Sequence, residues 1–173
     1  MSTNTRVMSC TPEAVFAVLR DGWLFPVWVV GASRMRAVDA RWPGVGSALH
    51  HSFGAWPFLI NDETRVEESS EPTHLVLRAK GWPIGEARVQ IDIEPHARGC
   101  RVRIAERAIS GPGALLPDAL MNIPLFLRNI ETLKRLAYIA EGREENGELT
   151  IQTKQPFERS LTQKAPENRG LDD

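Results

Sequence analysis

The chain has 173 residues, a formal net charge of −1 at pH 7 and two cysteines. Its near-neutral charge predicts neither a nucleic-acid partner nor attraction to anionic membranes. Two cysteines are too few for a disulfide framework or a typical zinc site. One domain of this length buries about two thirds of its unfolded surface, so it needs no covalent staple. Because the N-terminus is polar, no signal peptide is expected and a cytoplasmic location is predicted.

The first part of the chain predicts a strand followed by two short helices. The strand is expected over residues 6–10, and Thr11 then caps a helix that has Pro12 at its first position. A second helix is expected over residues 23–29. The apolar run that begins there is roughly half the length of a membrane span and contains Pro26, so no membrane insertion is predicted.

Alternating side chains from residue 47 onward predict several strands separated by turns. One of them places Val89 and Ile91 on one face and Arg88 and Gln90 on the other. Clean alternation of this kind is typical of an antiparallel sheet with one face in water. The expected extended segments are residues 34–40, 47–54, 59–69, 74–80, 85–94 and 100–110.

The last regular element is expected to be a long helix over residues 114–141. Apolar residues recur at three- and four-residue steps through Ile123, Leu127, Ile130 and Leu133. This period predicts a wide apolar face. Leu127 and Ile130 are therefore expected to be buried against the sheet.

Gly142 is expected to end this helix, because glycine is a good C-terminal cap. Residues 143–173 are polar and lack an apolar period, which predicts a mostly disordered tail. Within this tail, residues 149–154 are an alternative strand. We therefore expect one folded domain over residues 1–142.

The order of these elements and several motifs resemble the START-like superfamily, also called SRPBCC, in its polyketide cyclase/dehydratase-like branch. The matching segments are TPEAVFAVLRDGWLFPVWVVGASRMRAVDARWPGVGSALHHSFGAWP, GWPIGEARVQIDIEP, RVRIAERAISGPG and LRNIETLKRLAYIAEG. The resemblance implies an α+β helix-grip fold. In that fold a curved antiparallel sheet wraps around a long C-terminal helix, two short helices follow the first strand, and an apolar cavity lies between sheet and helix.

Three ionisable side chains are candidates for acid/base chemistry in such a cavity. Because side chains alternate along a strand, the apolar neighbours of Glu106, Asp62 and His51 place all three on the inner face. A carboxylate in an apolar cavity has a raised pKa, which suits a general acid or base in dehydration or aldol cyclisation. The competing interpretation is that these groups pair with one another or with Arg128, or lie at a wet cavity mouth.

Aromatic and amide side chains are the candidates for ligand contact. Five tryptophans are many for this length, and aromatic walls suit a flat apolar ligand. The alternative is that tryptophans only plug the ends of the barrel. The predicted ligand-binding residues are Trp28, Trp56, Phe53, Asn122, Phe126 and Asn129.

No metal site and no cofactor are predicted, because the histidines and cysteines lack a recognised ligand spacing and no phosphate loop is present. The preferred hypothesis is a domain that binds a small hydrophobic or aromatic molecule between sheet and helix. One alternative is a polyketide cyclase/dehydratase-type enzyme, and another is a protein-interaction module whose interior is filled by side chains. The sequence leaves the oligomeric state open and is compatible with a homodimer.

Overall fold

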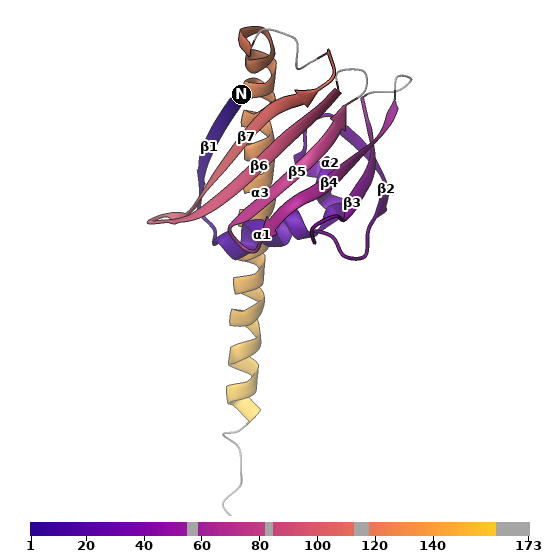
Figure 1. The fold of residues 1–173 in the computed structure, drawn as a ribbon. Helices are drawn as coiled ribbons and strands as arrows, with labels where there is room; N and C mark the ends of the chain where they lie inside the picture. Colours follow the sequence, from indigo (N-terminus) through magenta and orange to yellow (C-terminus); the bar gives the residue numbers. More distant parts are fainter. Residues whose placement is uncertain (55–58, 82–84, 113–117, 162–173) are drawn as a thin grey trace, which may run out of the picture.

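A computed structural model describes residues 1–54, 59–81, 85–112 and 118–161, with side chains of the last helix described from residue 123 to residue 147. Its centre is a seven-stranded sheet with the order β1-β7-β6-β5-β4-β3-β2, in which all neighbouring strands are antiparallel (Figure 1). The strands are β1 (Ser2–Met8), β2 (Ala32–Val38), β3 (Ala48–Phe53), β4 (Ile60–Ser70), β5 (His74–Gly81), β6 (Gly85–His96) and β7 (Gly99–Ser110).

Three short helical segments connect β1 to β2. Helix α1 (Pro12–Arg20) begins as predicted, since the Thr11 hydroxyl accepts a hydrogen bond from the backbone N–H of Ala14 at 3.2 Å. A 3₁₀ turn, η1 (Gly22–Leu24), then leads into α2 (Phe25–Trp28). The expected second helix is therefore present, divided into two pieces.

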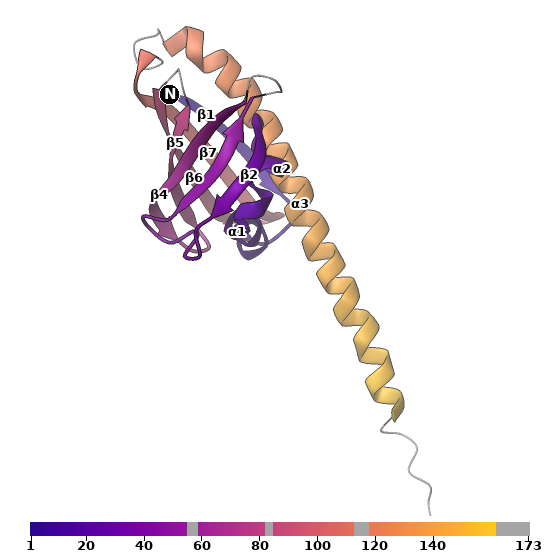
Figure 2. The same ribbon diagram turned by 90° about the vertical axis from the view of Figure 1, so that its right-hand side faces the viewer.

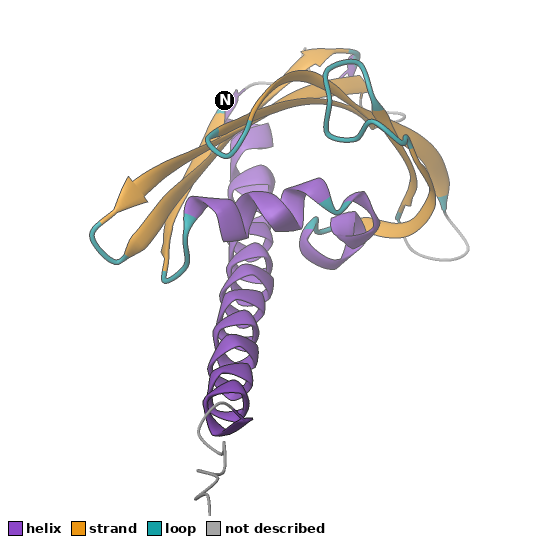
Figure 3. Ribbon diagram, turned by 90° about the horizontal axis from the view of Figure 1, so that it is seen from below, coloured by secondary structure: helices purple, strands orange, loops and turns teal. Residues whose placement is uncertain are grey.

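The long helix α3 (Asp118–Leu161) follows β7. The sheet curves over α1 and α3, so the helices lie on its concave side (Figure 3). In side view α3 runs along the open side of the curved sheet and its last turns extend beyond the sheet (Figure 2). This is the α+β helix-grip arrangement expected from the sequence.

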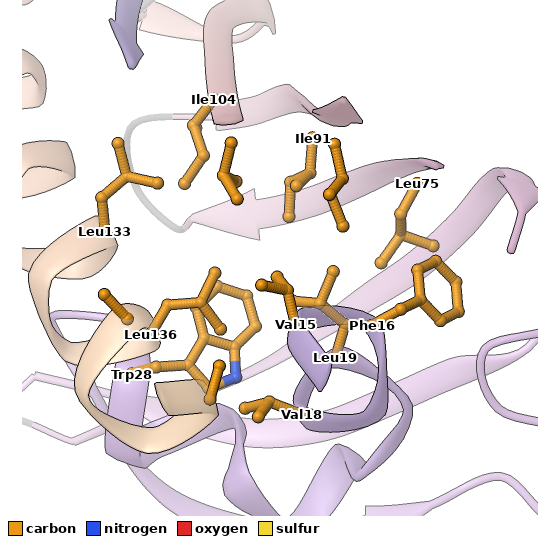
Figure 4. Close-up of a cluster of buried hydrophobic side chains, with 14 of the residues drawn as sticks. Val15, Phe16, Val18, Leu19, Trp28, Leu75, Ile91, Ile104, Leu133 and Leu136 are labelled. Carbon is orange, nitrogen blue, oxygen red and sulfur yellow. The ribbon is translucent and has the colours of Figure 1, made fainter. Parts of the chain in front are cut away.

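The hydrophobic core joins the concave face of the sheet to α1 and α3 (Figure 4). Phe16 of α1, Ile91 of β6 and Leu136 of α3 are all fully buried in it. Burying a side chain of this kind stabilises the fold by about 1.5–3 kcal/mol. The core thus fixes the position of α3 against the sheet.

The predicted inner face of α3 is wrong at Leu127 and Ile130, whereas Leu133, which was assigned to the same face, is buried as expected. Leu127 is 62% exposed and Ile130 is also exposed, whereas Asn129, Thr132 and Leu136 are buried. Apolarity alone assigned the inner face incorrectly, because two of the inner residues are polar. Each of these two has a partner. Asn129 donates a hydrogen bond to Glu106, and the Thr132 hydroxyl accepts one from the backbone N–H of Val30, just after α2.

The predicted end of α3 is also wrong, because the helix passes through Gly142 and continues to Leu161. The alternative strand over residues 149–154 is therefore absent. Two glutamates hold the helix around Gly142 to the turn before α1. Glu141 accepts a hydrogen bond from the backbone N–H of Ser9, and Glu144 accepts hydrogen bonds from the backbone N–H and the hydroxyl of Thr11. The domain boundary at residue 142 stays a prediction.

Candidate functional site

Two adjoining interior spaces lie between the concave face of the sheet and α3. The larger has a volume of about 210 Å³ and the smaller about 70 Å³. The two spaces share five lining residues, Phe53, Ala79, Lys80, Glu106 and Arg128. We refer to both together as the cavity.

One wall of the cavity carries a buried carboxylate with two partners. Glu106, on β7, is only 4% exposed. Its Oε2 atom accepts a hydrogen bond from an Arg128 NH2 group and another from Asn129 Nδ2 at 3.1 Å. The structure therefore agrees with the competing interpretation, in which Glu106 pairs with Arg128. The Nε atom of Arg128 is buried and has no hydrogen-bond partner among the described residues.

A second polar pair lies on β3 and β4, where His51 and Asp62 are directly opposite each other. Both are buried, with exposed fractions of 1% and 7%. His51 Nε2 is 2.9 Å from the Thr64 hydroxyl oxygen, and Asp62 Oδ1 accepts a hydrogen bond from the backbone N–H of Glu63 at 2.8 Å. Among the described residues, neither His51 Nδ1 nor Asp62 Oδ2 has a partner.

The imidazole of His51 is neutral near pH 7. Burial lowers its pKa below the ordinary value of 6.5, and the nearby Asp62 carboxylate opposes only part of this effect. A neutral imidazole has one donor and one acceptor nitrogen. Since Nε2 is engaged with Thr64, Nδ1 is the nitrogen left for another molecule.

Aromatic side chains form the apolar part of the same wall. Trp28 is buried and meets Phe25 edge to face at 5.5 Å between ring centres. Phe25 in turn lies 5.1 Å from the His51 ring, and Phe53 is 6.5 Å from that ring on its own strand. Trp28, Phe53 and His51 therefore line the cavity together.

The structure brings together most, but not all, of the predicted site residues. Glu106, Asp62 and His51 face inward as expected, and Trp28, Phe53 and Asn129 join them. Phe126 does not: it is exposed and lines neither space, because the inner face of α3 is turned toward Asn129. Trp56 lies outside the described residues. Asn122 lies in α3, but its side chain is outside the described part.

The sequence did not assign several lining residues to the site, including Phe25, Thr64 and Ala79. Alternation does place Thr64 on the inner face, because it lies two residues after Asp62, but gives no reason to choose it as a site residue. Arg128 was considered only as a partner of the carboxylates, although it lines both spaces. No local pattern identifies an arginine that reaches inward from a helix edge.

A larger hollow of about 390 Å³ lies on the outer side of α3, where Glu131, Lys134 and Arg135 line it. These side chains are solvent-accessible and form ion pairs with one another, so the hollow lacks the buried polar atoms of the cavity. Among the described residues, no three His, Cys, Asp or Glu side chains are grouped to hold a metal ion. Within the same part of the chain, no helix has both the length and the hydropathy of a membrane span.

Solved structures with the same fold include proteins of several kinds. Protein CV1439 from Chromobacterium violaceum is 21% identical, with a TM-score of 0.59 and coverage of 79% of this chain and 94% of that one. The structure of Ara h 8.0201 has 14% identity, a TM-score of 0.63 and coverage of 81% of this chain and 96% of that one. The di-domain ARO/CYC protein StfQ of the steffimycin biosynthetic pathway has 12% identity, a TM-score of 0.61 and coverage of 83% and 51%.

At these identities the similarity establishes the fold alone. No curated protein sequence matches the chain significantly. The sequence does match one family, described as polyketide cyclase/dehydrase and lipid transport, over residues 2–137. This match spans the sheet, α1, α2 and the part of α3 that contacts the cavity. The chain therefore belongs to the polyketide cyclase/dehydrase and lipid transport family.

Proposed function

We propose that the protein binds a small hydrophobic or aromatic molecule in the cavity between the sheet and α3. The observation that carries this proposal is the composition of the cavity wall. Apolar side chains such as Trp28 and Phe53 form most of it, and a few buried polar atoms converge on it. This combination is typical of small-molecule sites.

The size of the cavity supports a ligand of up to about three aromatic rings. Its two spaces, of about 210 and 70 Å³, place it near the lower end of the usual range for ligand pockets, about 300–1,000 Å³. The similarity to an ARO/CYC protein of a biosynthetic pathway supports an aromatic ligand. Family membership supports a hydrophobic one.

A fluorescence titration with the neutral apolar dye N-phenyl-1-naphthylamine tests the proposal. The wild-type protein should enhance the fluorescence of the dye in a saturable way. Ala79→Phe should weaken binding at least about tenfold, because Ala79 lines both spaces and a phenyl ring there fills them. Arg107→Phe, on the exposed face of the sheet, is the matched control and should bind the dye as wild type does. Equal binding by Ala79→Phe and wild type would reject the cavity as the site.

We infer a second candidate function, acid/base catalysis of the cyclase or dehydratase type, from one specific observation. His51 is a neutral base whose Nδ1 atom has no partner among the described residues, and Glu106 and Asp62 are carboxylates on the same cavity. In the tautomer that carries its hydrogen on Nε2 and donates it to Thr64, Nδ1 is an acceptor and is suited to removing a proton next to a carbonyl group, which is the first step of an aldol reaction.

Proton exchange of a simple ketone tests this second candidate without knowledge of the substrate. The protein should accelerate exchange of the α-protons of 1-tetralone with D₂O, followed by NMR. His51→Phe should abolish the acceleration because it removes the base. Exchange at the uncatalysed rate with wild-type protein that binds the ketone would leave binding as the only function supported.

A further inference from the structure

Among the described residues, two histidine–aspartate pairs lie directly opposite each other on neighbouring strands: the buried pair His51–Asp62, which we call the inner pair, and the partly exposed pair His74–Asp92, which we call the outer pair. Besides burial, they differ in whether histidine and aspartate bond to each other. His74 and Asp92 lie directly opposite each other on β5 and β6 and bond directly, with 2.7 Å between Nδ1 and Oδ1. His51 and Asp62 lie directly opposite each other on β3 and β4. This inner pair makes no such bond, and both His51 Nδ1 and Asp62 Oδ2 lack a partner among the described residues.

Local contacts explain why the inner pair stays apart. His51 is held by Thr64 through Nε2 and packs on the ring of Phe25. Asp62 is held by the backbone N–H of Glu63 through Oδ1. Each side chain is therefore fixed by its other end, and the remaining nitrogen and oxygen belong to residues that are buried and line the cavity. A buried carboxylate oxygen without a donor is costly, so such a pair favours a bound group that supplies one.

One oxygen atom with an attached hydrogen satisfies both groups at once. Directly opposite residues have β-carbons about 4.5–5.5 Å apart, so a single oxygen atom bound between the two side chains is within reach of both. If the Thr64 hydroxyl donates to His51 Nε2, then His51 Nδ1 carries a hydrogen and donates to the bridging oxygen. The hydrogen of the bridging group then points to Asp62 Oδ2. A hydroxyl group fits this order of donors and acceptors, whereas an ether or methyl group does not.

We propose that His51 and Asp62 form a hydroxyl-recognition site, and that the ligand of this cavity is an apolar molecule with an alcohol or phenol group. This inference rests on the proposed binding function and specifies the chemical class of the ligand. The rings of the ligand lie against the aromatic wall formed by Phe25, Trp28 and Phe53. The hydroxyl group lies between His51 Nδ1 and Asp62 Oδ2.

Competition between matched ligands tests the inference. 2-Naphthol and 2-methoxynaphthalene have the same ring system, but only the first has a hydroxyl hydrogen. Each is titrated against full-length protein loaded with N-phenyl-1-naphthylamine. With wild type, 2-naphthol should displace the dye at a concentration at least about tenfold lower than 2-methoxynaphthalene, since hydrogen bonds to charged groups have this order of strength.

Two variants assign the preference to the inner pair. Asp62→Ala should reduce the ratio between the two ligands to about one, because it removes the acceptor of the hydroxyl hydrogen. Asp92→Ala removes the matched aspartate of the outer pair and should keep the wild-type ratio. His51→Phe is the second test should Asp62→Ala fail to fold, and it should also lose the preference.

The possible outcomes separate this inference from the binding proposal. A wild-type ratio near one, with normal dye binding, overturns the hydroxyl site and leaves the binding function intact. A preference that persists in both inner-pair variants also overturns it. Absence of dye binding to wild type overturns the binding function and this inference together.

Discussion

At the scale of single residues, the most informative contact is the one between Glu106 and the inner edge of α3. Alternation along β7 was enough to predict that Glu106 faces inward, since its neighbours Ile104 and Val102 are apolar. Its pairing with Arg128 could be named only as an alternative, because the rotation of α3 was not determined by its apolar residues. A hydropathy pattern could not identify this part of the inner face, because two of its residues, Asn129 and Thr132, are polar.

Removing the charge of Glu106 should lower stability. Glu106→Gln leaves the Arg128 guanidinium without its carboxylate partner, although water reaches part of that side chain. The free energy of unfolding should fall by about 1–3 kcal/mol in urea melts. The control is Glu68→Gln, an exposed partner of Arg88 on the outer face, which should change stability by less than about 0.5 kcal/mol. Unchanged or increased stability of Glu106→Gln would show that the pair does not stabilise the fold.

The lowered pKa of His51 predicts a pH dependence of stability. The unfolded histidine gains a proton as the pH falls through its ordinary value of 6.5, while the buried imidazole, whose pKa is lowered by burial, gains one only at a lower pH. The free energy of unfolding should therefore fall with decreasing pH below about 6.5, by at most about 1.4 kcal/mol per pH unit for one proton. The fall should stop below the pKa of the folded state.

Urea melts at roughly pH 5 and 7.5 measure this effect. His51→Gln should lose less stability than wild type across that interval. The carboxylates with lowered pKa are held by hydrogen bonds from arginines: Glu63 from Arg65, Glu86 from Arg78 and Glu131 from Arg135. Their contribution is lost only as the pH falls below the ordinary value of 4.5, so it lies outside the interval. The same pH dependence in variant and wild type would contradict the neutral, buried state of His51.

At the scale of elements, the six strands from β2 to β7 and the presence of the long helix were predicted, whereas the start of β1 at Ser2 and the end of α3 were not. Period-two alternation identified the strands because one face of the sheet is covered and the other is in water. The register of β3 against β4, which places His51 opposite Asp62, depends on long-range pairing that no local pattern contains. The continuation of α3 through Gly142 depends on bonds from Glu141 and Glu144 to a turn more than a hundred residues earlier.

Two leucines of α3 distinguish its inner and outer faces. Leu136 is fully buried and Leu127 is 62% exposed. Leu136→Ala should therefore lower the free energy of unfolding by about 2–5 kcal/mol, whereas Leu127→Ala should change it by less than about 0.5 kcal/mol. Thermal and urea melts of both variants give the comparison. A larger loss for Leu127→Ala would mean that the helix is rotated relative to this description.

Shortening α3 tests whether the segment just after Gly142 supports the domain. A chain that ends at Gly147 keeps the hydrogen bonds that Glu144 accepts from Thr11 and the one that Arg143 donates to Asp21. A chain that ends at Gly142 loses these bonds, so Thr11, which caps α1, loses its contact with Glu144. It should be less stable by about 1 kcal/mol, the order expected for exposed hydrogen bonds to a charged group. Equal thermal midpoints would place the domain boundary at residue 142.

At the scale of the whole molecule, the helix-grip architecture places an apolar wall and two polar pairs around one cavity. The fold class followed from the order of strands and helices and from the family resemblance. The chemistry of the site did not, because Glu106, His51 and Asp62 come from different strands and Arg128 from the helix. Only their arrangement in space shows that one carboxylate is paired while His51 Nδ1 and Asp62 Oδ2 have no partner among the described residues.

Native mass spectrometry of the protein purified from its own host tests most directly whether the cavity holds a ligand. The spectrum should show a complex with one small apolar molecule, whose added mass disappears under denaturing conditions. The Ala79→Phe variant, with its cavity filled, should show the mass of the protein alone. A wild-type protein that carries no adduct and binds none of the apolar probes would contradict the proposed binding function. An adduct retained equally by Ala79→Phe would contradict it as well, since the ligand would then lie outside the cavity.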